Sequence, residues 1–401
     1  MIRKKYNITI IVAAVLAVCF CAFTLTACLE QEDKEITTAV FESAEYDYDG
    51  NEHKIEVAGI PNGVSVVYEN NEATEPGVYD AKATLSGDGY KTLVLTATLT
   101  INEVTFVSDY DELCAALEKG GRIALSADIE LNGDDRIEIT KATLLNGCGH
   151  TVTASEFQAV DYRIVNVAAS NCTVEIKNIS FVATKSTGYM RGINVGVSEN
   201  LKIYLNNVNV SLPDYYALNI VRLNKNLEIN AENVSLSGWS AVNNHSYGVK
   251  FNAVNSTFTG TNIHESKGST SNHYTTIVAS NYVLYNDGDT FIEECLCANN
   301  TFEFENCRII SRVGETDGAA IDTMQYLIDL RSPFNNKLYL SNCELSHCAG
   351  DDGRIHSAYD SAYIPDENRD DADFKIDTNK IFIDGIDVTS DETRVIKYLD
   401  E

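Results

Sequence analysis

The sequence predicts an all-β protein in which a small β-sandwich precedes a parallel β-helix, a solenoid of short strands. Three observations predict this fold class. A phrase of alternating apolar residues around an asparagine recurs six times between residues 174 and 345. An earlier stretch holds short alternating strands separated by turn residues. The composition, with three Met, one Trp and abundant Thr, Ser, Asn and Val, suits β-structure.

The repeated phrase fixes most of the predicted architecture. Alternation with a period of two marks a strand with one buried face, and recurrence at a near-fixed interval marks a solenoid. Successive asparagines lie 29, 26, 22, 51 and 36 residues apart, so most intervals suit one coil and the interval of 51 suits two. The six asparagines are Asn178, Asn207, Asn233, Asn255, Asn306 and Asn342.

An asparagine has a physical role where one strand bends sharply into the next. It tolerates the left-handed backbone region better than most residues do. Its amide can donate to the coil on one side and accept from the coil on the other, at a spacing of about 4.8 Å. We therefore expect an internal asparagine ladder along the column.

The amino-terminal segment is an export signal rather than part of the fold. Arg3, Lys4 and Lys5 precede an apolar stretch over 8–25. This is the arrangement of a secretory signal peptide.

The end of this segment, Leu25-Thr26-Ala27-Cys28, resembles the lipobox of bacterial lipoproteins. The resemblance implies a cleaved leader over 1–27, a diacylglyceryl group on the Cys28 thiol, and an anchor and tether over 28–36. Two acyl chains suffice for stable anchoring, so the expected location is the extracytoplasmic face of a bacterial cell membrane. An uncleaved transmembrane helix and an ordinary secreted product are the alternatives.

Residues 37–102 lack the asparagine phrase and read as short strands between turns, which predicts a small sandwich. Matching motifs are Tyr48-Asp49-Gly50, the strand over 63–68, Gly77-Val78-Tyr79, Gly87-Asp88-Gly89-Tyr90 and the strand over 97–101. On these motifs the stretch resembles the Ig-like bacterial surface modules called MBG domains. The resemblance implies a spacer that lifts the next domain off the membrane.

The β-helix over 104–348 opens with a predicted capped helix. Ser108 begins a capping-box-like spacing, Leu113, Ala116 and Leu117 form one apolar face, and Gly120-Gly121 ends the helix. Such a helix can cover the open end of a solenoid.

A strand over 122–131 and the turn Leu144-Leu145-Asn146-Gly147-Cys148-Gly149-His150 follow this helix. Together, these elements resemble the opening of right-handed parallel β-helices of the pectate-lyase-like superfamily. That superfamily holds lyases, hydrolases, esterases and non-catalytic surface proteins, so the fold alone does not give the function.

The last stretch, 349–401, is rich in aspartate and ends with a predicted strand over 380–388. We expect it to return and cap the carboxyl end of the column, with disorder over 366–373.

Charge limits the possible partners. Asp and Glu number 59 against 30 Lys and Arg, for a formal net charge of −29. Such a chain is a poor ligand for nucleic acid, whereas cations or basic partners suit it.

Eight cysteines remain after Cys19, Cys21 and the anchor are set aside. Because Cys307 and Cys343 occupy the position that Ile179 holds in the phrase, we expect mostly free, stacked thiols that act as small buried apolar groups. A bridge between Cys343 and Cys348 is the alternative. The eight are Cys114, Cys148, Cys172, Cys295, Cys297, Cys307, Cys343 and Cys348.

Candidate chemical groups gather late in the chain. A carboxylate pair beside an arginine could hold a metal and abstract a proton alpha to a uronate carboxyl group. None of these runs matches the catalytic motifs of pectate lyases or polygalacturonases, and close Asp and Arg pairs also arise by chance in so acidic a chain. Candidate catalytic residues are Asp329, Arg331, Asp351, Arg354 and His356, and Asp317 and Asp322 are candidates for binding calcium; no cofactor is firmly implied.

Tyrosines in the predicted segments between strands could stack on sugar rings, although such residues are more often half-buried loop residues. They are Tyr215, Tyr216, Tyr247, Tyr274 and Tyr282.

Three functions are compatible with this sequence. The first is a non-catalytic surface protein that binds a glycan or a partner protein. The second is a polysaccharide lyase or hydrolase that acts on acidic polysaccharide, which requires charged side chains of adjacent coils to meet in one groove. The third is a scaffold without a binding groove.

Overall fold

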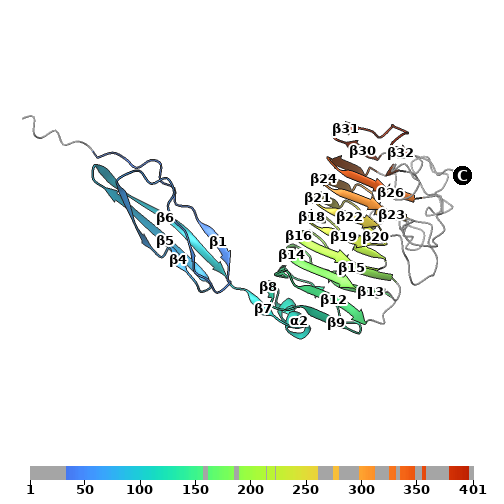
Figure 1. Ribbon diagram of the computed structural model, residues 1–401, viewed down its shortest axis with the longest axis horizontal. Coiled ribbons are helices and arrows are strands. Elements are labelled where there is room, and N and C mark those ends of the chain that lie inside the picture. Colours follow the sequence, from blue (N-terminus) through green and yellow to red (C-terminus); the bar gives the residue numbers. More distant parts are fainter. Residues whose placement is uncertain are drawn as a thin grey trace, which may run out of the picture. The chain divides into compact units, whose positions relative to one another are not determined.

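The structure, a computed structural model, divides the chain into two compact units, Met1–Glu103 and Val104–Glu401. Each unit is described by itself (Figure 1). The residues that the structure describes are 33–156, 161–184, 189–213, 215–221, 223–260, 274–279, 298–311, 325–330, 335–347, 355–357 and 379–396. The leader, Cys28 and the segment over 366–373 lie outside these residues.

The first unit contains a four-stranded sheet in the order β1-β6-β5-β3. Strand β1 runs parallel to β6, whereas the other neighbours are antiparallel. Alternate residues Ala81, Ala83 and Leu85 of β5 are buried, and they pack with Ile55 and Val57 from the segment that follows β2. The unit that was predicted to be a small sandwich thus contains this four-stranded sheet and a two-stranded antiparallel sheet, β2-β4. Its strands are β1 (Ala44–Asp47), β2 (His53–Lys54), β3 (Val64–Glu69), β4 (Glu72–Ala73), β5 (Gly77–Gly87) and β6 (Tyr90–Asn102).

The second unit is the predicted parallel β-helix. It begins with β7 (Thr105–Val107) and a single described helix, α2 (Tyr110–Lys119). The residue that caps the helix is Asp109, one position after the expected Ser108, because the Asp109 carboxylate accepts from the Glu112 backbone N–H at 2.9 Å. Ser108 instead donates its backbone N–H and its hydroxyl to the Glu112 carboxylate, so the return bond of the capping arrangement reaches the residue before the cap. Leu113, Ala116 and Leu117 are buried as expected.

Each coil of the β-helix contributes strands to three parallel columns (Figure 1). Column 1 contains β8 (Gly121–Leu125), β11 (Thr143–Asn146), the first half of β14 (Cys172–Ala183), the first half of β16 (Leu201–Ser211), β18 (Glu228–Glu232), β21 (Lys250–Val254), β24 (Thr301–Glu305), β27 (Lys337–Ser341) and β30 (Lys380–Ile383).

Column 2 contains β9 (Ile129–Asn132), β12 (Thr151–Glu156), the second halves of β14 and β16, β19 (Ser235–Gly238), β22 (Thr257–Gly260), β25 (Arg308–Ser311) and β28 (Glu344–His347).

Column 3 contains β10 (Ile137–Ile139), β13 (Asp161–Val167), β15 (Tyr189–Val195), β17 (Tyr216–Ile220), β20 (Ser240–Asn244), β23 (Tyr274–Ala279), β26 (Gln325–Leu330), β29 (Ile355–His356) and β32 (Val395–Ile396).

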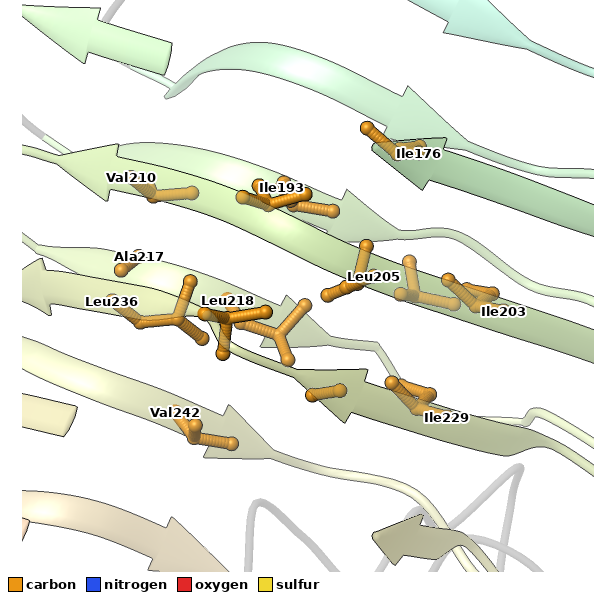
Figure 2. Close-up of a cluster of buried hydrophobic side chains, with 14 of the residues drawn as sticks. Ile176, Ile193, Ile203, Leu205, Val210, Ala217, Leu218, Ile229, Leu236 and Val242 are labelled. Carbon is orange, nitrogen blue, oxygen red and sulfur yellow. The ribbon is translucent and has the colours of Figure 1, made fainter. Parts of the chain in front are cut away.

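One continuous apolar core runs inside the three columns. In-register residues repeat the same type from coil to coil, as in Ile203, Ile229 and Phe251 of column 1, which are at most 1% exposed. Figure 2 shows Leu205 of column 1, Val210 and Leu236 of column 2, and Leu218 and Val242 of column 3 gathered in this interior. Burial of this column, rather than any single contact, stabilises the second unit.

The six repeated asparagines stand where column 1 bends into column 2. Each has a left-handed backbone, with φ between 50° and 55°. The Asn207 amide donates to the Asn178 oxygen at 3.0 Å, and that of Asn342 donates to the Asn306 oxygen at 2.6 Å.

The expectation that this ladder is internal is wrong. Asn178 is half-buried, whereas Asn207, Asn233, Asn255, Asn306 and Asn342 are exposed. The bend between the two columns is convex, so the side chain at its apex lies on the outside. The ladder is an outer seam.

The interval of 51 residues between Asn255 and Asn306 spans one coil and not the two that were expected. Strand β21 pairs directly with β24, and β22 pairs directly with β25. The register of the described strands is thus kept although 51 residues separate the two asparagines, since a longer loop costs little additional closure entropy.

The carboxyl end of column 1 is formed by the predicted last strand. Strand β30 pairs in parallel with β27 and in antiparallel with the short β31 (Ile386–Asp387). This hairpin turns the chain back at the end of the column.

Replacing Asn207 with alanine should lower the free energy of unfolding by about 1 kcal/mol, because alanine is disfavoured in the left-handed region. Asn207→Gly should be nearly neutral, since glycine adopts this backbone freely. Urea denaturation of the purified protein measures both changes. Asn206→Ala, at the exposed neighbouring position, is the matched control and should stay within about 0.5 kcal/mol; equal losses for alanine and glycine at 207 would contradict this account.

Candidate functional site

Column 3 carries a row of buried asparagines that the repeated phrase did not reveal. Asn194, Asn219 and Asn243 occupy the same register position and are 2%, 1% and 0% exposed. Their amides donate in sequence, each at 2.7 Å: Asn243 to Asn219, Asn219 to Asn194, and Asn194 to Asn166. The Asn166 amide then donates to the Glu138 carboxylate at 2.7 Å. These residues form a buried amide ladder, distinct from the six asparagines of the repeated phrase.

The ladder lies on the face of column 3 opposite the core, since Val165 and Val167 on either side of Asn166 point into the core. A sequence signal for it existed: an asparagine within an apolar strand recurs after 28, 25 and 24 residues, which is the coil period. Asn166, Asn194 and Asn219 each donate and accept within the row, and Asn243 donates to Asn219, so these described members of the row have a structural role.

Two of the catalytic candidates fall on this same register position. Asn243 is the partner of Val278, Val278 that of Asp329, and Asp329 that of His356. Asp329 and His356 are therefore neighbours on adjacent strands. The His356 ring is 2% exposed. Arg331, Asp351 and Arg354, as well as the calcium candidates Asp317 and Asp322, lie outside the described residues.

The described residues offer little acid–base or metal chemistry. Within the described ranges, no three His, Cys, Asp or Glu side chains come together as a metal site requires. Each described carboxyl with a displaced pKa is displaced downward because it accepts hydrogen bonds: Asp49 to about 2, with Asp128, Glu228 and Asp391 also lowered. A general acid needs the opposite displacement.

The tyrosines considered for sugar stacking have a packing role where the structure describes them. Tyr215 and Tyr216 both stack on Trp239, with ring centroids 5.6 and 5.5 Å away. The Arg191 guanidinium lies 5.5 Å from the Tyr215 ring centre, and burial lowers its pKa. Tyr247 contacts the Asn299 amide through its hydroxyl. The side chains of Tyr274 and Tyr282 lie outside the described residues.

The outer face of column 1 is accessible in every coil from β14 to β30. Along β16, for example, residues alternate between buried and exposed from Leu201 to Asn206. Register alignment produces three outward rows. They are Thr173, Lys202, Glu228, Lys250, Thr301, Lys337 and Lys380; Glu175, Tyr204, Asn230, Asn252, Glu303, Tyr339 and Phe382; and Lys177, Asn206, Glu232, Val254, Glu305 and Ser341.

A polar network orders the middle of this face. Glu228 accepts from the Asn230 amide at 3.1 Å and pairs with the Lys202 ammonium at 3.3 Å, and both contacts lower its pKa. The Asn252 amide donates to the Asn230 oxygen at 2.9 Å. At the carboxyl end, the Tyr339 and Phe382 rings stack at 4.9 Å with an angle of 6°.

A hollow of about 230 Å³ opens on this face where three strands begin. The Glu228 carboxylate lies between the Lys202 and Lys250 ammonium groups, and two corner asparagines add amides to the lining. Such a lining can hydrogen-bond both donors and acceptors. The lining residues are Asn200, Lys202, Asn226, Leu227, Glu228, Gly248 and Lys250.

A comparison with protein families finds a match over the first coils of the β-helix. Residues 104–212, from the start of the second unit to the end of β16, match a family model described as "Putative pectate lyase-like adhesive domain". No curated protein and no solved structure matches the chain. The match supports the pectate-lyase-like β-helix and an adhesive role for domains of this kind. Within the described part of the chain, no helix is long and apolar enough to cross a membrane.

Replacing Asn219 with alanine should lower the free energy of unfolding by about 2 kcal/mol, because buried amides on both sides lose a partner. Denaturant unfolding measures the change. The exposed corner residue Asn200, which also bonds amides on both sides, is the matched control. A loss at Asn219 no larger than that of Asn200→Ala would show that burial does not strengthen the ladder.

Proposed function

We propose that this protein is a bacterial surface adhesin that is held to the cell membrane through Cys28 and binds a glycan or a partner protein without cleaving it. The observation that carries the proposal is the outer face of column 1. It presents exposed polar and aromatic side chains in register over successive coils of a rigid core. Repetition of this kind suits an extended ligand, since adjacent coils offer adjacent subsites.

The family match supports the adhesive part of this proposal, since it covers the first coils of the same β-helix. The lipobox-like Leu25-Thr26-Ala27-Cys28 supports the anchor. The MBG-like unit would then act as a spacer between membrane and β-helix.

A second candidate function is cleavage of acidic polysaccharide, favoured by the register pairing of Asp329 with His356. Asp and His are residue types that commonly act as general acid and base. The burial of the His356 ring to 2% exposure disfavours direct contact with a polymer. Binding without cleavage is therefore the better-supported function.

Binding should depend on column 1. Lys202→Ala combined with Lys250→Ala should weaken retention on the bound polysaccharide or protein by about tenfold or more, because each charge-assisted hydrogen bond contributes about 1.5 to 3 kcal/mol. A panel of uronic-acid and neutral polysaccharides and surface proteins, scored for retention and for unsaturated product, measures this.

Lys82→Ala combined with Lys91→Ala makes the same charge change on the first unit and is the matched control. Equal loss in both double variants would contradict a site on column 1. Product formation that Asp329→Asn abolishes, with retention unchanged, would replace adhesion by the second candidate.

Cys28→Ser should release the protein from membranes into the soluble fraction, because two acyl chains would no longer hold it. Detergent phase partitioning of cells that express the full chain measures this. Cys21→Ser, within the same leader, should leave the protein in the detergent phase. Continued partitioning of the Cys28 variant with detergent would refute the anchor.

A further inference from the structure

Two cysteines occupy equivalent positions on neighbouring coils. Cys307 and Cys343 each follow a left-handed corner asparagine, and each precedes one of the register partners Arg308 and Glu344. The Glu344 backbone N–H donates to the Cys307 carbonyl at 2.9 Å. In-register residues of adjacent parallel strands lie about 4.8 Å apart, which falls within the Cα separations of disulfides, about 4.4 to 6.8 Å.

The two sulfur atoms also have matching surroundings. Cys307 Sγ lies 3.4 Å from the Ala253 carbonyl oxygen, and Cys343 Sγ lies 3.3 Å from the Phe304 carbonyl oxygen. Ala253 and Phe304 are register partners. Cys307 Sγ also lies 3.3 Å from the Glu305 carbonyl oxygen, and Cys343 Sγ lies 3.4 Å from the Ser341 carbonyl oxygen. Glu305 and Ser341 are register partners as well. Both thiols therefore point the same way, one coil apart.

Access and reactivity differ between the two thiols. Cys307 is 1% exposed, whereas Cys343 is half-buried. A hydrogen bond from the Cys307 thiol lowers the Cys343 pKa, although burial opposes this. The thiolate is the nucleophile in exchange reactions. Burial raises the pKa of Cys114, Cys148 and Cys172, so Cys343 is the most readily ionised of the five described thiols.

We propose that Cys307 and Cys343, which are free thiols in the structure, form a modification site at which a small disulfide introduces a covalent link between two neighbouring coils. The inference goes beyond the proposed binding function and does not rest on it. It requires only that the β-helix meets a low-molecular-weight disulfide.

The chemistry balances as two exchanges. The Cys343 thiolate attacks the small disulfide, breaks its sulfur–sulfur bond and releases one small thiolate. The Cys307 thiol then loses its proton to this small thiolate and attacks Cys343 Sγ, which releases the second small thiolate; that thiolate takes from water the proton that Cys343 had given up. Two protein thiols are oxidised, and one small disulfide is reduced to two thiols.

The link would close a loop of 36 residues between β25 and β28. It would hold together the last complete coils, at the end where a solenoid can unravel from its terminus. Cross-linking restricts the unfolded chain, so the oxidised protein should resist denaturant better than the reduced protein.

Oxidised glutathione added to the purified, reduced protein tests the site. We expect loss of the Cys307 and Cys343 thiols and an increase in the urea midpoint that a reductant reverses. Digestion with trypsin and a glutamate-specific protease should yield fragment 306–308 linked to fragment 338–344. A free Cys307 after full reaction, or a Cys343 linked instead to Cys348, would overturn the proposal.

Single variants separate the two steps. Cys307→Ser should stop at a glutathione adduct on Cys343, because the second exchange has lost its nucleophile. Cys343→Ser should leave Cys307 unmodified. Cys148→Ser is the matched control and should still form the link. If oxidation increased the urea midpoint of the Cys307 variant as much as that of the parent protein, the link between Cys307 and Cys343 would not be the cause of the increase.

Discussion

In-register stacking of parallel strands is the constraint on which the rest of this β-helix depends. Each position in a coil meets the same position in the next coil at one strand spacing. A side chain must therefore be compatible with a near copy of itself above and below. Branched and aromatic apolar groups satisfy this inside the column, as Ile203, Ile229 and Phe251 do. Amides satisfy it at the corners and in column 3, because each has both a donor and an acceptor.

The same constraint explains how much of the fold could be predicted. Period-two alternation around Asn178 and Asn207 gives strand, bend and strand directly, and the left-handed backbone follows from the tolerance of asparagine for that region. Which side of the bend faces water depends on how the two columns meet, which is a tertiary property. Between Asn255 and Asn306 the sequence interval does not predict the number of coils, because the register fixes how the strands pair and not how many residues separate them.

The functional residues were harder to predict for a related reason. Most of the Asp, Arg and His candidates that stand close together in the sequence lie outside the described residues, whereas the register shows which strand residues become neighbours. Asp329 and His356 lie 27 residues apart in sequence and are adjacent in column 3. Lys202 and Glu228 form an ion pair on column 1 for the same reason. Neither pair is visible as a motif, since each is created by the coil length between its members.

Placing side chains of the same kind at equivalent positions of neighbouring coils has a different effect for each chemical group. Amides donate to and accept from one another. Thiols such as those of Cys307 and Cys343 come close enough for the disulfide that we propose. Ammonium groups repel one another, and column 1 relieves this by placing Glu228 between Lys202 and Lys250. Lys337 and Lys380 are direct neighbours, and Lys380 has the Asp387 carboxylate at 3.8 Å. The pattern of charge along this face is thus set coil by coil, with cationic, anionic and neutral positions in a fixed order.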